Sequence, residues 1–422
     1  MEFFESYGLI LILLAAGVGF IMAWGIGAND VANAMGTSVG SKALTIKQAI
    51  VIAMIFEFAG AYLAGGEVTS TIRKGIIDPE YFSAIPEYLV LGMISSLFAA
   101  GIWLAFASWL GWPVSTTHSI IGAIIGFTAT GVSMDAVAWG KVGGIVGSWV
   151  VTPAISGIIA YLIFMSAHKL IFETKSPFEN AKRYVPFYMA LAGFIMSLVT
   201  IKKGLKHVGL EMSAVNGYIL AVIIAIILAI IGKWFIGRMK FSGSEDADLQ
   251  AANVEKVFAL LMVVTACSMA FAHGSNDVAN AIGPLAAVVS VVTSGGEINA
   301  SANLAWWILP LGGLGIVLGL AIFGHRVIKT IGQGITHLTP SRGFAAELAA
   351  ATTVVIASGT GLPISTTQTL VGAVLGVGLA RGVSALNLGI VRNIVVSWIV
   401  TLPAGAILSI IFFFALKAAF GV

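Results

Sequence analysis

Two copies of an Asn-Asp motif place acidic side chains between long apolar stretches of the chain. The first copy is GANDVANA at residues 27–34, and the second is GSNDVANA at residues 274–281. A carboxylate at bilayer depth costs roughly 2.5–3.5 kcal/mol on insertion scales, so these residues are functional candidates that need a partner. Clustered carboxylate and amide oxygens suit a small hard cation. The motif side chains are Asn29, Asp30, Asn33, Asn276, Asp277 and Asn280.

A second repeated motif places Ser-Thr-Thr behind a proline, in GWPVSTTH at residues 111–118 and GLPISTTQ at 361–368. Proline suits the first turn of a helix, and serine and threonine suit its cap. We therefore expect each motif to begin a half-helix that offers N–H groups and hydroxyls to an anion. The alternative is that the hydroxyls only bond their own or neighbouring helices. The anion-binding candidates are Ser115, Thr116, Thr117, Ser365, Thr366 and Thr367.

Four further polar residues lie in apolar surroundings. Glu57 and Glu347 could gate or relay cations, or could be protonated acids that hold helices together. His118 aligns with Gln368, and it could favour proton coupling or serve as a plain hydrogen-bonding histidine. Five basic residues lie near predicted span ends, where snorkelling to the membrane surface or topology signalling is expected, namely Arg73, Lys74, Arg326, Lys329 and Arg342.

Electrostatics favours a carrier that moves positive ions together with its anion. The four motif strings contain no lysine or arginine. Two like charges about 4 Å apart cost about 4 kcal/mol at an effective dielectric constant of about 20. A helix terminus returns only about 0.3–2 kcal/mol. We therefore expect the anion to enter with cations or protons that neutralise the acids.

The composition is that of a polytopic membrane protein. Of 422 residues, 58% are hydrophobic and 10% are charged, whereas soluble domains have about 25% charged residues. The net charge of +3 gives no argument for nucleic-acid binding. The single cysteine excludes an internal disulfide. We expect an all-α protein of about twelve transmembrane segments, near residues 7–24, 45–66, 86–109, 113–131, 138–165, 185–201, 214–236, 256–273, 304–323, 344–358, 363–380 and 391–418.

The two groups of five spans read as copies of each other. The Asn-Asp, Pro-Ser-Thr-Thr and SWVVTP/SWIVTLP strings recur in the same order, at offsets of 247, 250 and 249 residues. Five spans per copy, joined by two, predict an inverted repeat of the kind found in secondary transporters. We divide the chain into a first repeat at 1–165, two linking segments and a cytoplasmic loop at 166–255, and a second repeat at 256–422. Glycines predict interrupted helix at the Asn-Asp motifs; they are Gly25, Gly27, Gly36, Gly274 and Gly283.

Basic residues predict the orientation. Eight lie around two loops expected on one side, namely Lys169, Lys175, Lys182, Arg183, Lys233, Arg238, Lys240 and Lys256. Three lie in the intervening loop, namely Lys202, Lys203 and Lys206. The positive-inside rule then makes the first two loops cytoplasmic. Counting back five spans predicts that the N-terminus is outside.

The duplicated GANDVANAMG and GSNDVANAIG strings, with the paired Pro-Ser-Thr-Thr motifs, TIRKGI and LTPSRGFAAEL, resemble the inorganic phosphate transporter (PiT) family. The resemblance covers both halves, and the large cytoplasmic insert of animal members is absent, as in a prokaryotic-type protein. It implies a twelve-span symporter in the inner cell membrane, often a homodimer, that imports phosphate with sodium or protons and needs no other cofactor. It also implies that Asp30 and Asp277 are essential and that the Ser-Thr-Thr residues help to hold phosphate.

With the resemblance, the candidate residues form three groups. We assign phosphate to Ser115, Thr116, Thr117, Ser365, Thr366, Thr367, Asn29 and Asn276, and sodium to Asp30, Asn33, Asp277 and Asn280. Glu57, Glu347, His118 and Gln368 are candidates for gating or relay. Proton coupling, sulfate or another oxyanion as substrate, and a passive anion channel stay open as alternatives. An intramembrane hydrolase is rejected, because the chain has neither HExxH nor GxSxG.

Overall fold

The chain folds almost entirely into helices, which satisfy the backbone polar groups that lipid cannot. The computed structural model describes residues 2–201, 212–239, 247–298 and 304–422. Lys202, Lys203, Lys206 and Lys240 of the orientation argument lie outside these ranges. Residues 241–246 of the predicted cytoplasmic loop also lie outside them.

The helices follow the predicted order. The first group consists of α1 (Glu2–Gly40), α2 (Ile46–Ala64), α3 (Gly66–Lys74), α4 (Pro86–Leu110), α5 (Thr116–Gly131) and α6 (Trp139–Ala167), which continues into the π-helical turn η3 (His168–Phe172). The linking helices are α7 (Pro177–Val199) and α9 (Ala214–Arg238). The second group consists of α10 (Ala247–Thr293), α11 (Ile308–Gly334), α12 (Pro340–Gly359), α13 (Thr366–Ala380) and α14 (Leu388–Phe420). Short 3-10 turns lie at Pro79–Phe82, Met134–Ala136 and Val383–Ala385.

Each of the twelve predicted spans coincides with a helix, which confirms the all-helical membrane fold. Within the described residues, eight helices are long and apolar enough to cross a membrane, namely α1, α2, α4, α6, α9, α10, α11 and α14. Helices α5 and α13 have 16 and 15 residues, fewer than the about 20 needed for a crossing. These two are the half-helices that the Pro-Ser-Thr-Thr motifs predict.

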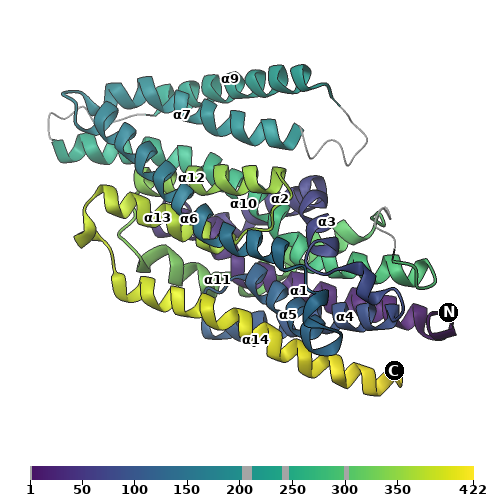
Figure 1. Cartoon of the computed structure of the whole chain (residues 1–422). Helices are drawn as coiled ribbons and strands as arrows, with labels where there is room; N and C mark the ends of the chain where they lie inside the picture. The colour runs from purple at the N-terminus through teal and green to yellow at the C-terminus, as the bar shows by residue number, and fades with distance from the viewer. Residues whose placement is uncertain (1, 202–211, 240–246, 299–303) are drawn as a thin grey trace.

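The two groups of helices are interleaved rather than packed as separate bodies. Helix α1 packs along α11, and its counterpart α10 packs along α2. Half-helix α5 packs against α14, and its counterpart α13 packs against α6. In Figure 1 the linking pair α7 and α9 lies along one side of the molecule and α14 along the opposite side, with both termini at the same end. Each copy therefore completes the core of the other.

The prediction of interrupted helix at the Asn-Asp motifs is wrong. Both motifs lie inside continuous helices, α1 and α10. The glycines instead allow close helix packing: a Cβ at Gly27 would lie 1.9 Å from the carbonyl oxygen of Ile316, and one at Gly274 would lie 2.2 Å from that of Glu57. The chain is interrupted one motif later, between α4 and α5 and between α12 and α13. Gly111 and Gly361 lie there, with φ of 70° and 72°.

Candidate functional site

Two half-helices begin at the Ser-Thr-Thr motifs, deep inside the protein. Ser115 is the N-cap of α5, where its hydroxyl accepts a hydrogen bond from the N–H of His118 (3.3 Å). Ser365 caps α13 through the N–H of Gln368 (3.2 Å). The remaining N–H groups of a first helical turn have no acceptor within the helix and give that end a partial positive charge. All six Ser-Thr-Thr residues are buried, so each half-helix directs this charge into the core.

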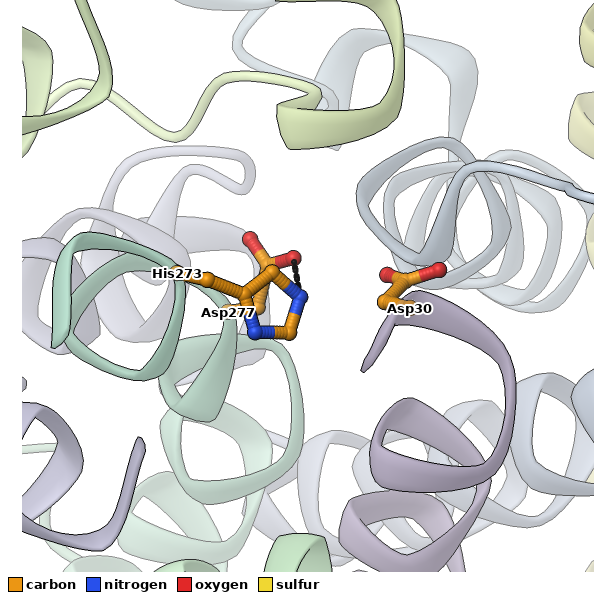
Figure 2. Close-up of side chains that lie close together, drawn as sticks. All are labelled: Asp30, His273 and Asp277. Carbon is orange, nitrogen blue, oxygen red and sulfur yellow. Dashed lines mark ion pairs between the residues drawn. The ribbon is translucent and has the colours of Figure 1, made fainter. Parts of the chain in front are cut away.

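The two motif aspartates face each other from α1 and α10, with a histidine beside Asp277. Figure 2 shows Asp30 opposite Asp277 and His273. One ligand atom from each of the three side chains lies within 4.8 Å of the others, and all three residues are buried. Two ionised carboxylates at this separation repel by about 3.5 kcal/mol at an effective dielectric constant of about 20. The arrangement therefore calls for a positive charge between the acids.

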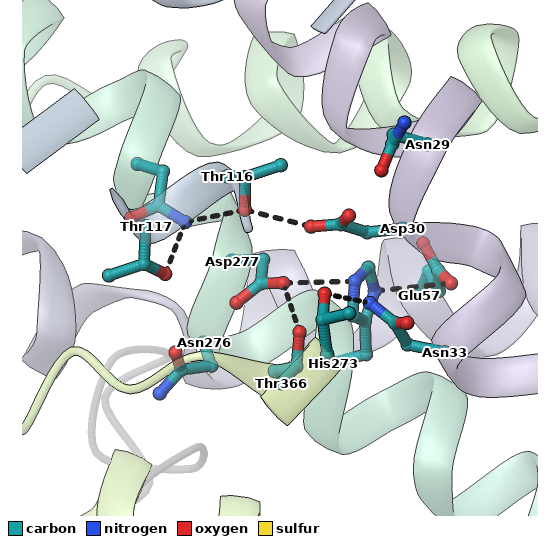
Figure 3. A network of polar contacts seen from close by, with 12 residues as sticks. Asn29, Asp30, Asn33, Glu57, Thr116, Thr117, His273, Asn276, Asp277 and Thr366 are labelled. Atoms are coloured by element: carbon teal, nitrogen blue, oxygen red, sulfur yellow. Dashed lines mark hydrogen bonds and ion pairs between the residues drawn. The ribbon is translucent and has the colours of Figure 1, made fainter. Parts of the chain in front are cut away.

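Threonines of the half-helices bind the aspartates. The hydroxyl of Thr116 donates to Oδ2 of Asp30 (2.8 Å), and that of Thr366 donates to Oδ2 of Asp277 (2.7 Å). Figure 3 shows these contacts within one polar network. They lie within each repeat and join each motif helix to the half-helix of its own copy.

The motif asparagines cross from one copy to the other. Nδ2 of Asn33 donates to the hydroxyl of Thr367 (2.7 Å). Nδ2 of Asn280 lies 3.2 Å from the hydroxyls of both Thr116 and Thr117. The site is thus assembled from α1, α5, α10 and α13 around the junction of the two copies. The structure brings together the residues that we assigned to sodium with the threonines that we assigned to phosphate.

Asn29 and Asn276 brace the site from the side. Nδ2 of Asn29 donates to the carbonyl of Trp112 (2.9 Å), and its Oδ1 accepts from the N–H of Val114 (3.2 Å). The amide of Asn276 lies 3.4 Å from the carbonyl of Leu362, which corresponds to Trp112, and 2.9 Å from the hydroxyl of Ser358. Both asparagines therefore fix the link that leads into a half-helix.

His273 is the residue that sequence reasoning missed. Its Nε2 lies 3.0 Å from Oδ2 of Asp277, and its Nδ1 lies 3.2 Å from Oε1 of Glu57, with all of these side chains fully buried. Its position one helical turn before Asp277 was the available signal, because residues four apart share a helix face. The structure therefore places Glu57 next to the site.

This histidine and glutamate make the two halves unequal. The residue in the first copy that corresponds to His273 is Ile26. Gly27 packs on Ile316 as Gly274 packs on Glu57, so Ile316 corresponds to Glu57. An ionisable pair beside Asp277 thus has a fully apolar equivalent beside Asp30.

Two buried oxygens in the site remain free to accept a ligand. Among the described residues, neither Oδ1 of Asp30 nor Oδ1 of Asn280 has a hydrogen-bond partner. Both side chains contact Thr116, so the two oxygens belong to the same part of the network. A buried acceptor without a partner costs about 1–3 kcal/mol. A bound cation would remove that cost.

The remaining candidates lie in other surroundings. Glu347 accepts hydrogen bonds from the hydroxyls of Thr37, Ser38 and Thr265, contributed by α1 and α10. The ring of His118 stacks on Trp149, with centroids 3.7 Å apart, and its Nδ1 lies 3.4 Å from the carbonyl of Trp398. The backbone N–H of Gln368 is held by Ser365. Of the four predicted gating residues, Glu57 is the one with a contact to the His273–Asp277 pair.

A pair of half-helices that meet at buried acids inside a bundle of membrane-spanning helices is typical of a transporter. Comparison with known proteins agrees: the model of the Phosphate transporter family matches residues 26–409. A candidate phosphate permease of Haemophilus influenzae is 58% identical over 420 residues, covering all of both chains. One from Pyrococcus abyssi is 46% identical over 402 residues, covering 95% of this chain and 97% of its own.

A solved structure supports the same assignment. The protein described as the sodium-dependent phosphate transporter superposes with a TM-score of 0.89 and 40% sequence identity, covering 97% of this chain and 99% of its own. The chain belongs to the phosphate transporter family. The resemblance drawn from the motifs is confirmed, and so is the rejection of an enzyme, because the family and these relatives are transporters.

Proposed function

We propose that this phosphate transporter is a symporter that imports inorganic phosphate together with sodium. The observation that carries the proposal is the pair of buried acids, Asp30 and Asp277, facing each other beneath two half-helix N-termini. An anion cannot approach two ionised acids without added positive charge. The solved relative is named as sodium-dependent, which supports sodium as that charge.

The proposed roles follow from the contacts. Sodium would be held by carboxylate and amide oxygens, with Oδ1 of Asp30 and Oδ1 of Asn280 available and Asn33 and Asp277 completing the set. Phosphate would be held by Thr116, Thr117, Thr366, Thr367 and the N–H groups of their helical turns. Ser115 and Ser365 would shape this site as the N-caps of the half-helices. Asn29 and Asn276 would hold the segments that lead into them.

Transport would proceed by alternating access, in which part of the bundle moves around the central site. We further propose that the protein is a homodimer in the inner cell membrane. Its N-terminus would lie outside, because the basic residues beside α6, α7 and α9 favour a cytoplasmic position for the loops there. The repeat boundaries at 1–165 and 256–422, with a linking segment at 166–255, are part of the same proposal.

Proton coupling is the second candidate, and the structure offers a specific observation for it. His273 lies between Glu57 and Asp277, where a proton on the ring would neutralise one of two carboxylates. Sulfate or another oxyanion is the alternative substrate. Sulfate stays doubly charged and has no proton to donate, whereas phosphate can donate one to a carboxylate.

One uptake experiment tests these proposals together. Radiolabelled phosphate uptake is measured in proteoliposomes on which sodium and proton gradients are imposed separately, with and without excess sulfate. We expect accumulation against the phosphate gradient with sodium alone, and no competition by sulfate. Accumulation with only a proton gradient would establish the second candidate. Mere equilibration of phosphate would identify a passive channel.

A further inference from the structure

A polar pocket of about 350 Å³ lies away from the central site, at the far end of half-helix α13. Arg342 from the first turn of α12 and Arg381 just after α13 line it, together with His168 and Glu255. Phe164 and Phe172 form an aromatic wall. The pocket thus combines two guanidinium groups with an apolar side.

The two arginines converge although both are positive. Nη1 of Arg342 donates to the carbonyl oxygen of His337 (3.0 Å), and Nη1 of Arg381 lies 3.5 Å from the same oxygen. Arg381 also contacts the hydroxyl of Thr336 (3.3 Å). Among the described residues, neither guanidinium lies within ion-pair distance of a carboxylate. Each retains N–H donors for a further acceptor, since a guanidinium has five.

The acid in the pocket offsets one of the two positive charges but forms no ion pair with either arginine. Oε2 of Glu255 accepts from the N–H of Ser341 (2.8 Å), and Oε1 accepts from the Ser341 hydroxyl (2.8 Å). Glu255 is therefore bound to the start of α12, where the helix dipole offers positive charge. His168 approaches Glu173 rather than Glu255, with an N–O distance of 4.0 Å. The pocket keeps an excess of positive charge directed at its interior.

Helix α13 connects the pocket to the central site. Helix α13 begins at the Ser-Thr-Thr motif and ends at Ala380, next to Arg381. At about 1.5 Å per residue, Arg381 lies roughly 20 Å along the helix axis from Thr367. His168 belongs to η3, at the start of the basic connection that we expect on the cytoplasmic side. The pocket therefore lies at the proposed cytoplasmic boundary of the bundle.

We propose that Arg342 and Arg381 form a second binding site for a phosphate group. Planar guanidinium forks match the geometry of phosphate oxygens, and paired arginines bind them strongly. The group belongs either to free phosphate on its way out of the protein or to the headgroup of an anionic phospholipid, whose acyl chain the aromatic wall would contact. The site is separate from the sodium and phosphate residues of the centre.

The test compares the wild type with the double variant Arg342→Gln/Arg381→Gln. Arg392→Gln is the matched control, because Arg392 is an exposed arginine of α14 that does not line the pocket. Binding of radiolabelled inorganic phosphate to purified protein is measured in sodium-free buffer, which on the proposed function weakens the central site. Retention of phosphatidylglycerol against phosphatidylcholine is counted by native mass spectrometry.

We expect the double variant to bind phosphate or retain phosphatidylglycerol about tenfold more weakly, and the control to match the wild type. Loss of phosphate binding identifies the free anion, and loss of retained lipid identifies the headgroup. Unchanged behaviour in both measurements overturns the proposal. If Asp277→Asn abolishes phosphate binding in sodium-free buffer and the double variant does not, the bound phosphate lies in the central site. That outcome contradicts the second site and also the proposed sodium dependence of the central site. Arg381→Gln alone, on an exposed residue after the helix, replaces the double variant if that variant does not fold.

Discussion

Asp30 and Asp277 connect the residues of the site network, and substitutions of these two aspartates test its proposed chemistry. Exchanging Asp30 or Asp277 for asparagine keeps the size of the side chain and its contact with Thr116 or Thr366, but removes the charge. We expect either change to abolish sodium-driven accumulation of phosphate while the protein stays folded. Proteoliposome uptake checks the first part, and the thermal midpoint of the purified variant checks the second. Accumulation at the wild-type level by both variants would contradict the role of the acids.

The buried pair of His273 and Glu57 makes a second prediction at this scale. Removing one partner of a buried ion pair costs about 3–5 kcal/mol, whereas replacing both with apolar residues is often neutral. The apolar equivalents are already present in the chain as Ile26 and Ile316. His273→Ile leaves both Glu57 and Asp277 without their buried partner, and adding Glu57→Ile removes one of these two acids. We therefore expect His273→Ile to destabilise the protein more than the two changes combined.

A double-mutant cycle on the unfolding midpoint measures this coupling. Additive losses would show that histidine and glutamate do not act as a pair. Phosphate uptake by the double variant then separates folding from transport, because a folded variant without sodium-driven uptake assigns the pair to the transport cycle.

At the scale of single side chains, much of the candidate site was predictable and one part was not. The repeated motifs identified Asp30, Asp277 and the threonines, because unusual residues recurring in order are visible in the letters alone. His273 was not predicted, because comparison of the two copies selects residues that both copies share. His273 has no polar counterpart in the first copy. Glu57 could not be assigned to the site because its contact with His273 joins α2 to α10.

At the scale of elements, glycines set how closely the helices approach. Gly27 and Gly274 looked like helix breakers, but an apolar environment keeps α1 and α10 intact, and the missing side chains admit a neighbouring backbone. The sequence could not distinguish these roles, since both call for glycine. The true interruptions were predictable, because Pro113 and Pro363 with their capping serines have a directional preference for helix starts.

This packing predicts a clear contrast between glycine variants. Gly27→Ala and Gly274→Ala would place a Cβ against a carbonyl oxygen, so we expect each to destabilise the protein by about 1–3 kcal/mol or more. Gly147→Ala on α6 is the control, because a Cβ there would meet nothing within 4 Å. It should be neutral or stabilising by up to about 1 kcal/mol. Thermal unfolding in detergent measures all three, and equal midpoints would contradict the close-packing role.

At the scale of the whole molecule, the two copies depend on each other. The offset between motifs establishes that the chain is duplicated, but it does not say whether each copy packs with itself or with its partner. The structure gives the answer: α5 rests on α14, α13 rests on α6, and Asn33 and Asn280 bind threonines of the opposite copy. Each half-helix is therefore supported by the final helix of the other copy, and a movement of one copy acts directly on the binding residues of the other.

This exchange predicts how a divided chain behaves. If the chain is cut within residues 240–246, the fragment ending at Met239 lacks α13 and α14, and the fragment beginning at Ala247 lacks α5 and α6. Neither can bury its half-helix alone, so we expect each to be degraded or aggregated when expressed singly. Expressed together, the fragments should co-purify and restore phosphate uptake, since the contacts between them need no covalent link. Size-exclusion chromatography of single and co-expressed fragments measures folding and co-purification, and proteoliposome uptake measures transport. A monodisperse, folded fragment on its own would show that the halves are independent, and the central site would then have to be explained without the interleaved helices.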